Sequence, residues 1–184
     1  MQEPIFRQCL SAPNDTTARQ LGEHKNLFIK EFTSYWHNRV EKSQKLKHFY
    51  YTFKTANAPE KYLTSNINPQ HRQVFAAFRL GNHKLAIKTM RYSRPKIPYE
   101  ERLCPFCKTE VEDETHFFFK CLMEAYTGIR EAFLSQVSQI VTKFCLLNEV
   151  DKTFYPITQE SQDLTTLTAS FIFDLTACRD KQLR

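Results

Sequence analysis

The sequence predicts an all-α fold, a helical bundle with a small CCHC zinc knuckle between its helices. Three observations lead to this prediction. Apolar residues recur at intervals of three and four along most of the chain, which is typical of amphipathic helices. Only 3 glycines occur among 184 residues, too few for a turn-rich β-sandwich or barrel, whereas 16 phenylalanines provide ample material for a core. The third observation is one cluster of cysteine and histidine.

The cluster lies in the segment CPFCKTEVEDETHFFFKC, where Cys104, Cys107, His116 and Cys121 form the pattern C-x2-C-x8-H-x4-C. Three thiolates and one imidazole make a closed tetrahedral site, which Zn²⁺ occupies as a structural ion. The alternative is three buried free thiols beside a core histidine. Paired cysteines with a further histidine and cysteine at ligand spacing favour zinc.

Local signals predict how the ligands are presented. Pro105 fixes φ between the first two cysteines, so that both sulfurs can face one ion. Asp113 is typical of an N-cap, which places His116 early in a helix. At about 100° per residue, Cys121 would lie about 140° from the His116 face. We therefore expect the helix to tighten or end between them.

The N-terminal part is expected to begin with a flexible arm, residues 1–22, which lacks periodicity. A helix follows from Asn26 to about Lys42, and a second one, capped by Ser43, runs past Phe53 and stops before Pro59. A short helical turn is possible at residues 60–63. The apolar stripe of the first helix consists of Leu27, Phe28, Phe32, Tyr35, Trp36 and Val40.

Residues 68–91 predict two short helices joined by a tight turn. Asn68 caps the first, Pro69 takes its first position, and Gly81 ends it. The second would run from His83 to about Arg91. This outline fits a helix-turn-helix, but any αα-hairpin in a bundle gives the same pattern. The following RYSRPKIPYEER is expected to be extended, because two prolines in four residues exclude helix.

The C-terminal part predicts a long helix up to about Leu147, a loop at FYPITQE, and a last helix that starts at Thr158 or Ser161. A strand near residues 171–173 is the alternative to the last helix. We expect four regions: the arm 1–22, a helical domain 23–97, a zinc-knuckle module 98–130, and C-terminal helices 131–184. The buried edge of the last helix would be Leu164, Leu167, Phe171 and Leu175.

Charge is distributed unevenly along the chain. Residues 61–108 contain ten basic and two acidic residues, whereas residues 110–180 contain twelve acidic and five basic ones. A basic region of this kind indicates a polyanionic partner.

The basic region also contains aromatic residues, a combination that suits single-stranded RNA or DNA, whose bases stack while its phosphates pair with cations. The alternative is a solvated linker with anchoring tyrosines. The candidate phosphate contacts are Arg79, His83, Lys84, Lys88, Arg91, Arg94, Lys96 and Arg102, and the candidate stacking faces are Tyr92 and Phe106.

Several other functions lack a sequence signal. Glycines at positions 22, 81 and 128 cannot form a nucleotide-binding loop. A Cys/His nucleophile could use Cys9 or Cys178, but neither has a suitable neighbour, and we interpret Glu112, Asp113 and Glu114 as charges at a helix N-terminus. We expect no enzyme activity, no small-molecule substrate, no membrane span and no secretory signal. Without a disulfide framework, an intracellular protein is expected, nuclear or cytoplasmic.

The segment FRLGNHKLAIKTMRYSRPKIPYEERLCPFC, together with VEDETHFFFKC, resembles the C-terminal Cys/His (CCHC) segment of reverse-transcriptase polyproteins of non-LTR (LINE-type) retrotransposons. The similarity covers roughly residues 30–135 and is densest at 79–121. Lys88 and Met90 depart from the family's Glu and Gly, and Leu122 stands where Pro is common. The matching positions are Arg79, His83, Lys84, Leu85, Ala86, Ile87, Arg91, Tyr92, Arg94, Pro95, Pro98, Arg102, Cys104, Cys107, Glu112, Asp113, Glu114, His116, Phe117 and Cys121.

The family's polymerase and endonuclease parts lie upstream of this segment, so the resemblance implies neither activity here. It implies a zinc-binding tail of a retroelement, or a host protein derived from one. Two functions therefore stay open: a nucleic-acid-binding module, or a structural or protein-interaction domain. They are distinguished by whether the basic residues converge on one exposed face beside the zinc.

Overall fold

The computed structural model describes residues 18–43, 59–159 and 161–184. The chain divides into two units, Met1–Ala58 and Pro59–Arg184. Most of the expected arm, and the helix expected after Ser43, lie outside the described residues. Within them the only β-structure is one isolated bridge, between Leu103 and Val111, and the Cys/His cluster lies between helices. The all-α prediction is therefore confirmed.

The first unit is described by helix α2 (Ala18–Lys42), which begins eight residues before the predicted start. Its apolar stripe is only partly buried, because Phe32 and Tyr35 are exposed whereas Val40 is buried. Helical periodicity thus predicted the helix correctly, but periodicity alone does not show that a face is covered.

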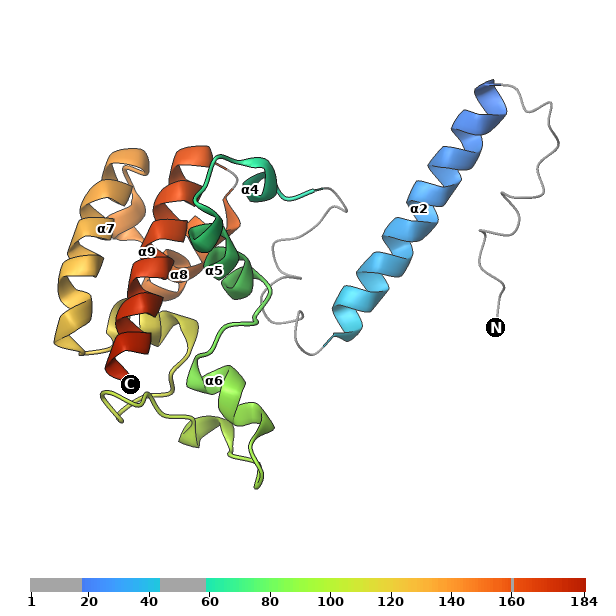
Figure 1. The fold of residues 1–184 in the computed structure, drawn as a ribbon. Helices are drawn as coiled ribbons and strands as arrows, with labels where there is room; N and C mark the ends of the chain where they lie inside the picture. Colours follow the sequence, from blue (N-terminus) through green and yellow to red (C-terminus); the bar gives the residue numbers. More distant parts are fainter. Residues whose placement is uncertain (1–17, 44–58, 160) are drawn as a thin grey trace. The chain divides into compact units, whose positions relative to one another are not determined.

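In the second unit, the other main helices pack around α9 (Gln162–Gln182), as Figure 1 shows. These are α5 (Pro69–Arg79), α7 (Thr127–Ile140) and α8 (Glu149–Thr158). Short α4 (Lys61–Thr64) also contacts α9. The expected edge of α9 is mostly buried, since Leu164, Phe171 and Leu175 are at most 4% exposed.

Aromatic rings from several helices form the core of this unit. Phe171 of α9 stacks on Phe133 of α7 with ring centroids 4.0 Å apart. Phe118 lies in the segment that carries the Cys/His cluster, residues 104–121, called here the metal segment. It contacts both Phe171 and Phe78 of α5. Each buried ring contributes roughly 1.5–3 kcal/mol relative to exposure. The segment that carries the Cys/His cluster is therefore anchored in the same core as the long helices.

The predicted start and end of α5 are confirmed. The Asn68 side chain accepts a hydrogen bond from the Gln70 N–H, and Gly81 adopts a positive φ of 59° after the last turn. The second helix is much shorter than predicted: α6 covers Ala86–Thr89, followed by the 3₁₀ turn η1 (Met90–Tyr92). The chain is then irregular, apart from the single turn η2 (Tyr99–Glu101).

Two predictions in the C-terminal part are wrong. Helix α7 ends at Ile140, because Val141 turns to an extended conformation before the short turn η5 (Phe144–Leu146). Residues FYPIT belong to α8, where a loop was expected. Asn148 caps α8 by accepting from the Asp151 N–H, and Pro156 lies near the other end, where it removes only a late backbone hydrogen bond.

Candidate metal centre

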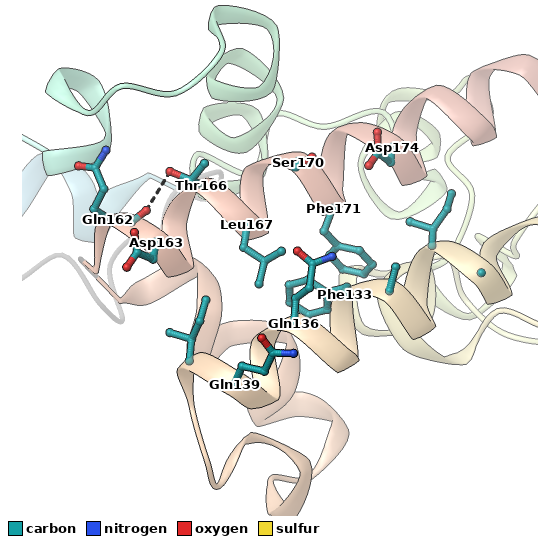
Figure 2. A pocket seen from close by; sticks show the side chains of 14 residues that line it. Phe133, Gln136, Gln139, Gln162, Asp163, Thr166, Leu167, Ser170, Phe171 and Asp174 are labelled. Carbon is teal, nitrogen blue, oxygen red and sulfur yellow. Dashed lines mark hydrogen bonds between the residues drawn. The ribbon is translucent and has the colours of Figure 1, made fainter.

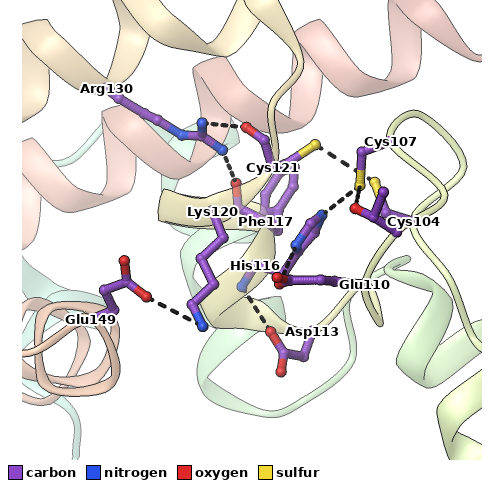
Figure 3. A network of polar contacts seen from close by, with 11 residues as sticks. Cys104, Cys107, Glu110, Asp113, His116, Phe117, Lys120, Cys121, Arg130 and Glu149 are labelled. Carbon is purple, nitrogen blue, oxygen red and sulfur yellow. Dashed lines mark hydrogen bonds and ion pairs between the residues drawn. The ribbon is translucent and has the colours of Figure 1, made fainter.

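Four side chains from two short segments converge on one point. One ligand atom each from Cys104, Cys107, His116 and Cys121 lies within 4.8 Å of every other. The Sγ atoms of Cys104 and Cys121 are 3.6 Å apart, and Cys107 Sγ lies 3.3 Å from His116 Nε2 (Figure 3). The sulfur–sulfur distance is far longer than the roughly 2.05 Å of a disulfide. The four residues predicted as ligands therefore form a cluster that could hold a metal ion.

The first two ligands are presented by a short antiparallel loop. Cys104 N–H donates to the Glu110 carbonyl at 2.9 Å, next to the bridge between Leu103 and Val111. The chain reverses at Lys108, whose N–H donates to the Cys104 carbonyl at 3.0 Å and whose φ is 56°. This left-handed conformation makes the loop tight enough for both sulfurs to face the same point.

The other two ligands lie at the two ends of a helical turn. The Asp113 carboxylate accepts from the His116 N–H at 2.7 Å, so the predicted N-cap is confirmed. The helix was expected to tighten or end between the two ligands. It ends at Lys120, and its last turn, His116–Lys120 (η3), is a wider π-helical turn and not a tighter one. Cys121 N–H donates to the His116 carbonyl at 2.8 Å, a bond that spans five residues. One wide turn brings residues five apart almost above one another, and both side chains reach the same point.

Polar side chains outside the cluster contact its ligands. Glu110 Oε2 lies 3.2 Å from His116 Nδ1 and so holds the ring with Nε2 facing the sulfurs. The Thr109 hydroxyl donates to Cys107 Sγ at 3.2 Å. A carboxylate on the far nitrogen of a ligating histidine, and hydrogen bonds to ligating sulfurs, are common features of metal sites.

The three thiols differ in acidity. Burial raises the pKa of Cys104 to about 12 and also raises that of Cys121. Burial also acts on Cys107, but hydrogen bonds from the Thr109 hydroxyl and from the Thr109 and Glu110 N–H groups lower its pKa to about 6. Cys107 is therefore a thiolate at neutral pH, whereas a bound cation would have to displace the protons of the two buried thiols.

Arg130 of α7 secures the end of the ligand turn. Its guanidinium donates to three backbone carbonyls. Those of Cys121 at 2.6 Å and Phe117 at 3.1 Å are drawn in Figure 3, and the third is that of Phe118 at 2.7 Å. These are carbonyls that a helix end leaves without intrahelical partners. The sequence analysis did not identify Arg130, because only the fold brings α7 to this turn.

The acidic residues before His116 have a different role from the one predicted. Glu112 is 1% exposed and receives two hydrogen bonds from Arg179 of α9, both at 2.8 Å. Glu114 lies 2.8 Å from His83 Nε2. Only Asp113, which stands between these two residues in the sequence, caps the helix. Glu112 and Glu114 therefore form buried polar contacts that join the metal segment to α9 and to the chain just before α6.

Three of the predicted nucleic-acid contacts are committed to internal interactions, which corrects that part of the prediction. Arg79 is 3% exposed, pairs with Glu60 and donates to the Ile157 carbonyl. His83 is buried against Glu114. Arg102 is half-buried and donates to the carbonyls of Ile87 and Ile97. These side chains position backbone and have little capacity left for a ligand.

The other candidates fall mainly on residues 84–99, called here the basic segment. Lys84, Arg94 and Lys96 are exposed, and Tyr92 is 72% exposed. Figure 1 shows α6 and the chain after it at one end of this unit, beside the main helices. Lys88 and Arg91 are half-buried, with Lys88 Nζ 3.7 Å from Glu114. Phe106 lies outside this segment, half-buried and edge-on to Tyr126.

Comparison with protein-family models, with curated proteins and with solved structures found no match. Among the described helices, none combines the length and the apolar character that crossing a membrane requires.

Proposed function

We propose that Cys104, Cys107, His116 and Cys121 bind one Zn²⁺ as a structural ion. A tetrahedron with zinc–sulfur bonds of about 2.3 Å has sulfur–sulfur edges of about 3.8 Å. The 3.6 Å between Cys104 and Cys121 Sγ is close to that value. Four protein ligands leave no position for a catalytic water, so the proposed role is non-enzymatic. Zinc-bound thiolates also suit a reducing compartment, the cytoplasm or the nucleus.

The zinc centre would hold the basic segment in place. Ile87 N–H donates to the Glu112 carbonyl at 3.3 Å, and Ala86 N–H donates to the Glu112 carboxylate at 2.6 Å. Arg102, next to the loop, ties the carbonyls of Ile87 and Ile97 together. Because these bonds all start at the metal segment or beside it, the metal would order α6 and the chain that follows.

We propose that the basic segment binds single-stranded RNA or DNA. The observation that carries this proposal is that Lys84, Arg94 and Lys96 are exposed in the same segment as the exposed ring of Tyr92. Cations can pair with phosphates while the ring stacks on a base. The proposed module is similar to the C-terminal tail of a LINE-type reverse transcriptase. In support, Glu112, Asp113 and Glu114, which carry that resemblance, lie between the proposed ligands Cys107 and His116, and His83 contacts Glu114.

A structural or protein-interaction domain is the second candidate. The internal use of Arg79, His83 and Arg102 favours it, because these side chains stabilise the fold. Glu100 and Glu101 also place two exposed carboxylates directly after the basic segment.

The experiment is fluorescence anisotropy of the zinc-loaded chain with labelled oligonucleotides of 20 nucleotides, RNA and DNA, over a range of salt concentrations. Affinity should fall steeply with salt, because each neutralised phosphate releases counterions. Arg94→Ala or Lys96→Ala should flatten the log–log slope by about 0.7. Tyr92→Ala should cost about 1–3 kcal/mol and leave the slope unchanged.

Lys143→Ala is the matched control, since Lys143 is an exposed cation outside the basic segment. It should bind like the wild type. Absence of binding at low salt, or equal effects of Lys143→Ala and Arg94→Ala, would favour the second candidate instead.

A further inference from the structure

A groove with an apolar floor lies between α7 and α9 on the surface of the second unit. Its volume is about 790 Å³. The stacked rings of Phe133 and Phe171 lie at its centre, beside Leu167 (Figure 2), and Ile140 also belongs to its lining. Gly128 belongs to the lining at the start of α7, and a Cβ there would meet no atom within 4 Å. The space beside Gly128 is therefore open.

The groove is acidic in a chain whose net charge is +6. None of its lining residues is Lys, Arg or His, whereas Asp163 and Asp174 stand at opposite ends (Figure 2). Both carboxylates are exposed, and neither has an ion-pair partner within the described part of the chain. A cationic ligand would therefore complement both ends of the groove.

The dimensions of the groove correspond to one short helix. Asp163 and Asp174 are eleven residues apart on α9, about 16 Å at 1.5 Å per residue, which is three helical turns. The walls are two antiparallel helices, since the start of α7 faces the end of α9. A helix that lies in the groove between two helices can place one apolar stripe on the floor.

We propose that this groove binds an amphipathic helix of a partner protein. The helix has apolar residues at positions i, i+3 or i+4, and i+7, and a Lys or Arg near each end, about eleven residues apart. Its apolar stripe covers Ile129, Ile140 and Leu167 and the small exposed edges of Phe133 and Phe171, and its cations pair with Asp163 and Asp174. This site is separate from the basic segment and does not depend on nucleic-acid binding.

The test is selection from a displayed library of 14-residue stapled helices, with randomised positions on one face and at both ends, against the zinc-loaded full-length chain. Selected helices should carry the apolar stripe and Lys or Arg at both ends. The double variant D163K/D174K should bind these helices at least tenfold more weakly and should itself select helices with acidic ends. Glu131→Lys, on α7 outside the groove lining, is the matched control and should select the same helices as the wild type.

Ser170→Trp, which fills the groove from α9, should abolish selection while zinc content and helical circular dichroism stay unchanged. Three results would overturn the proposal. They are a library that yields no binder, binders that tolerate both Ser170→Trp and D163K/D174K, and a dimer in sedimentation that Ser170→Trp dissolves. The last result would assign the groove to a second copy of the chain.

Discussion

Lys108 has a left-handed backbone in the loop that presents the first two ligands. Its φ of 56° is the one positive value among the non-glycine residues of the described chain. A side chain at this angle costs about 1–3 kcal/mol, and the cost persists only where the surroundings enforce the conformation. Here the N–H of Lys108 is fixed by the Cys104 carbonyl.

Lys108→Gly should therefore raise the free energy of unfolding of the zinc-loaded protein by about 1 kcal/mol, because glycine adopts this φ without strain. Lys108→Val should lower it by about 1–2 kcal/mol, since a β-branched residue fits this region poorly. Urea denaturation measures both. Lys96→Gly, exposed and without a positive φ, is the control and should be neutral or destabilising. A loss of stability in Lys108→Gly would contradict a left-handed loop.

At the scale of single residues, short-range signals were predictable from the sequence. The four ligand positions follow from their spacing, and Asp113 was identified as a cap from its place before the helix. The partners of Glu112 and Glu114 were not predictable. Arg179 is 67 residues from Glu112 in the chain, and no local pattern connects positions that far apart.

At the scale of elements, the π-helical turn at His116–Lys120 shows how one helix serves two ligands five residues apart. A regular α-helix would point the two side chains in different directions, so the sequence correctly predicted that a regular helix does not continue from His116 to Cys121. It did not predict that the departure is a π-helical turn. Arg130 of α7 stabilises this wide turn by donating to two of its carbonyls and to the carbonyl of Cys121, which follows it.

Arg130→Lys should weaken zinc binding about tenfold or more. A single ammonium group cannot reach all three carbonyls, so the hydrogen bond that fixes the backbone of Cys121 is lost or weakened. Competition with a chromophoric chelator measures the affinity. Lys120→Met is the control, since Lys120 belongs to the same turn and forms only an exposed ion pair with Glu149. If Arg130→Lys bound zinc as tightly as Lys120→Met, the turn would not need Arg130.

Helix ends were the least predictable property of the elements. Periodicity located α5, α7 and α9, but it carried the prediction of α7 beyond Ile140 and missed α8 altogether. In α8 the cap formed by Asn148 and the packing against α9 outweigh the presence of Pro156. Tertiary contacts therefore decide where apolar patterns end.

At the scale of the whole second unit, the metal segment connects elements that are distant in the chain. Glu112 joins α6 to α9, and Phe118 joins α5 to α9. The fold class was predictable because helical periodicity and the scarcity of glycine apply along the whole chain. Which basic side chains are buried and which are exposed was not predictable, because the composition of the sequence does not distinguish Arg79 from Arg94.

The central proposal is that Cys104, Cys107, His116 and Cys121 of this unit form a closed zinc site. X-ray absorption spectroscopy of protein purified with zinc tests it most directly, together with metal analysis. The account predicts about one zinc per chain, with three sulfur ligands at about 2.3 Å and one nitrogen at about 2.0 Å. Protein without bound metal, or a zinc shell dominated by oxygen, would contradict it.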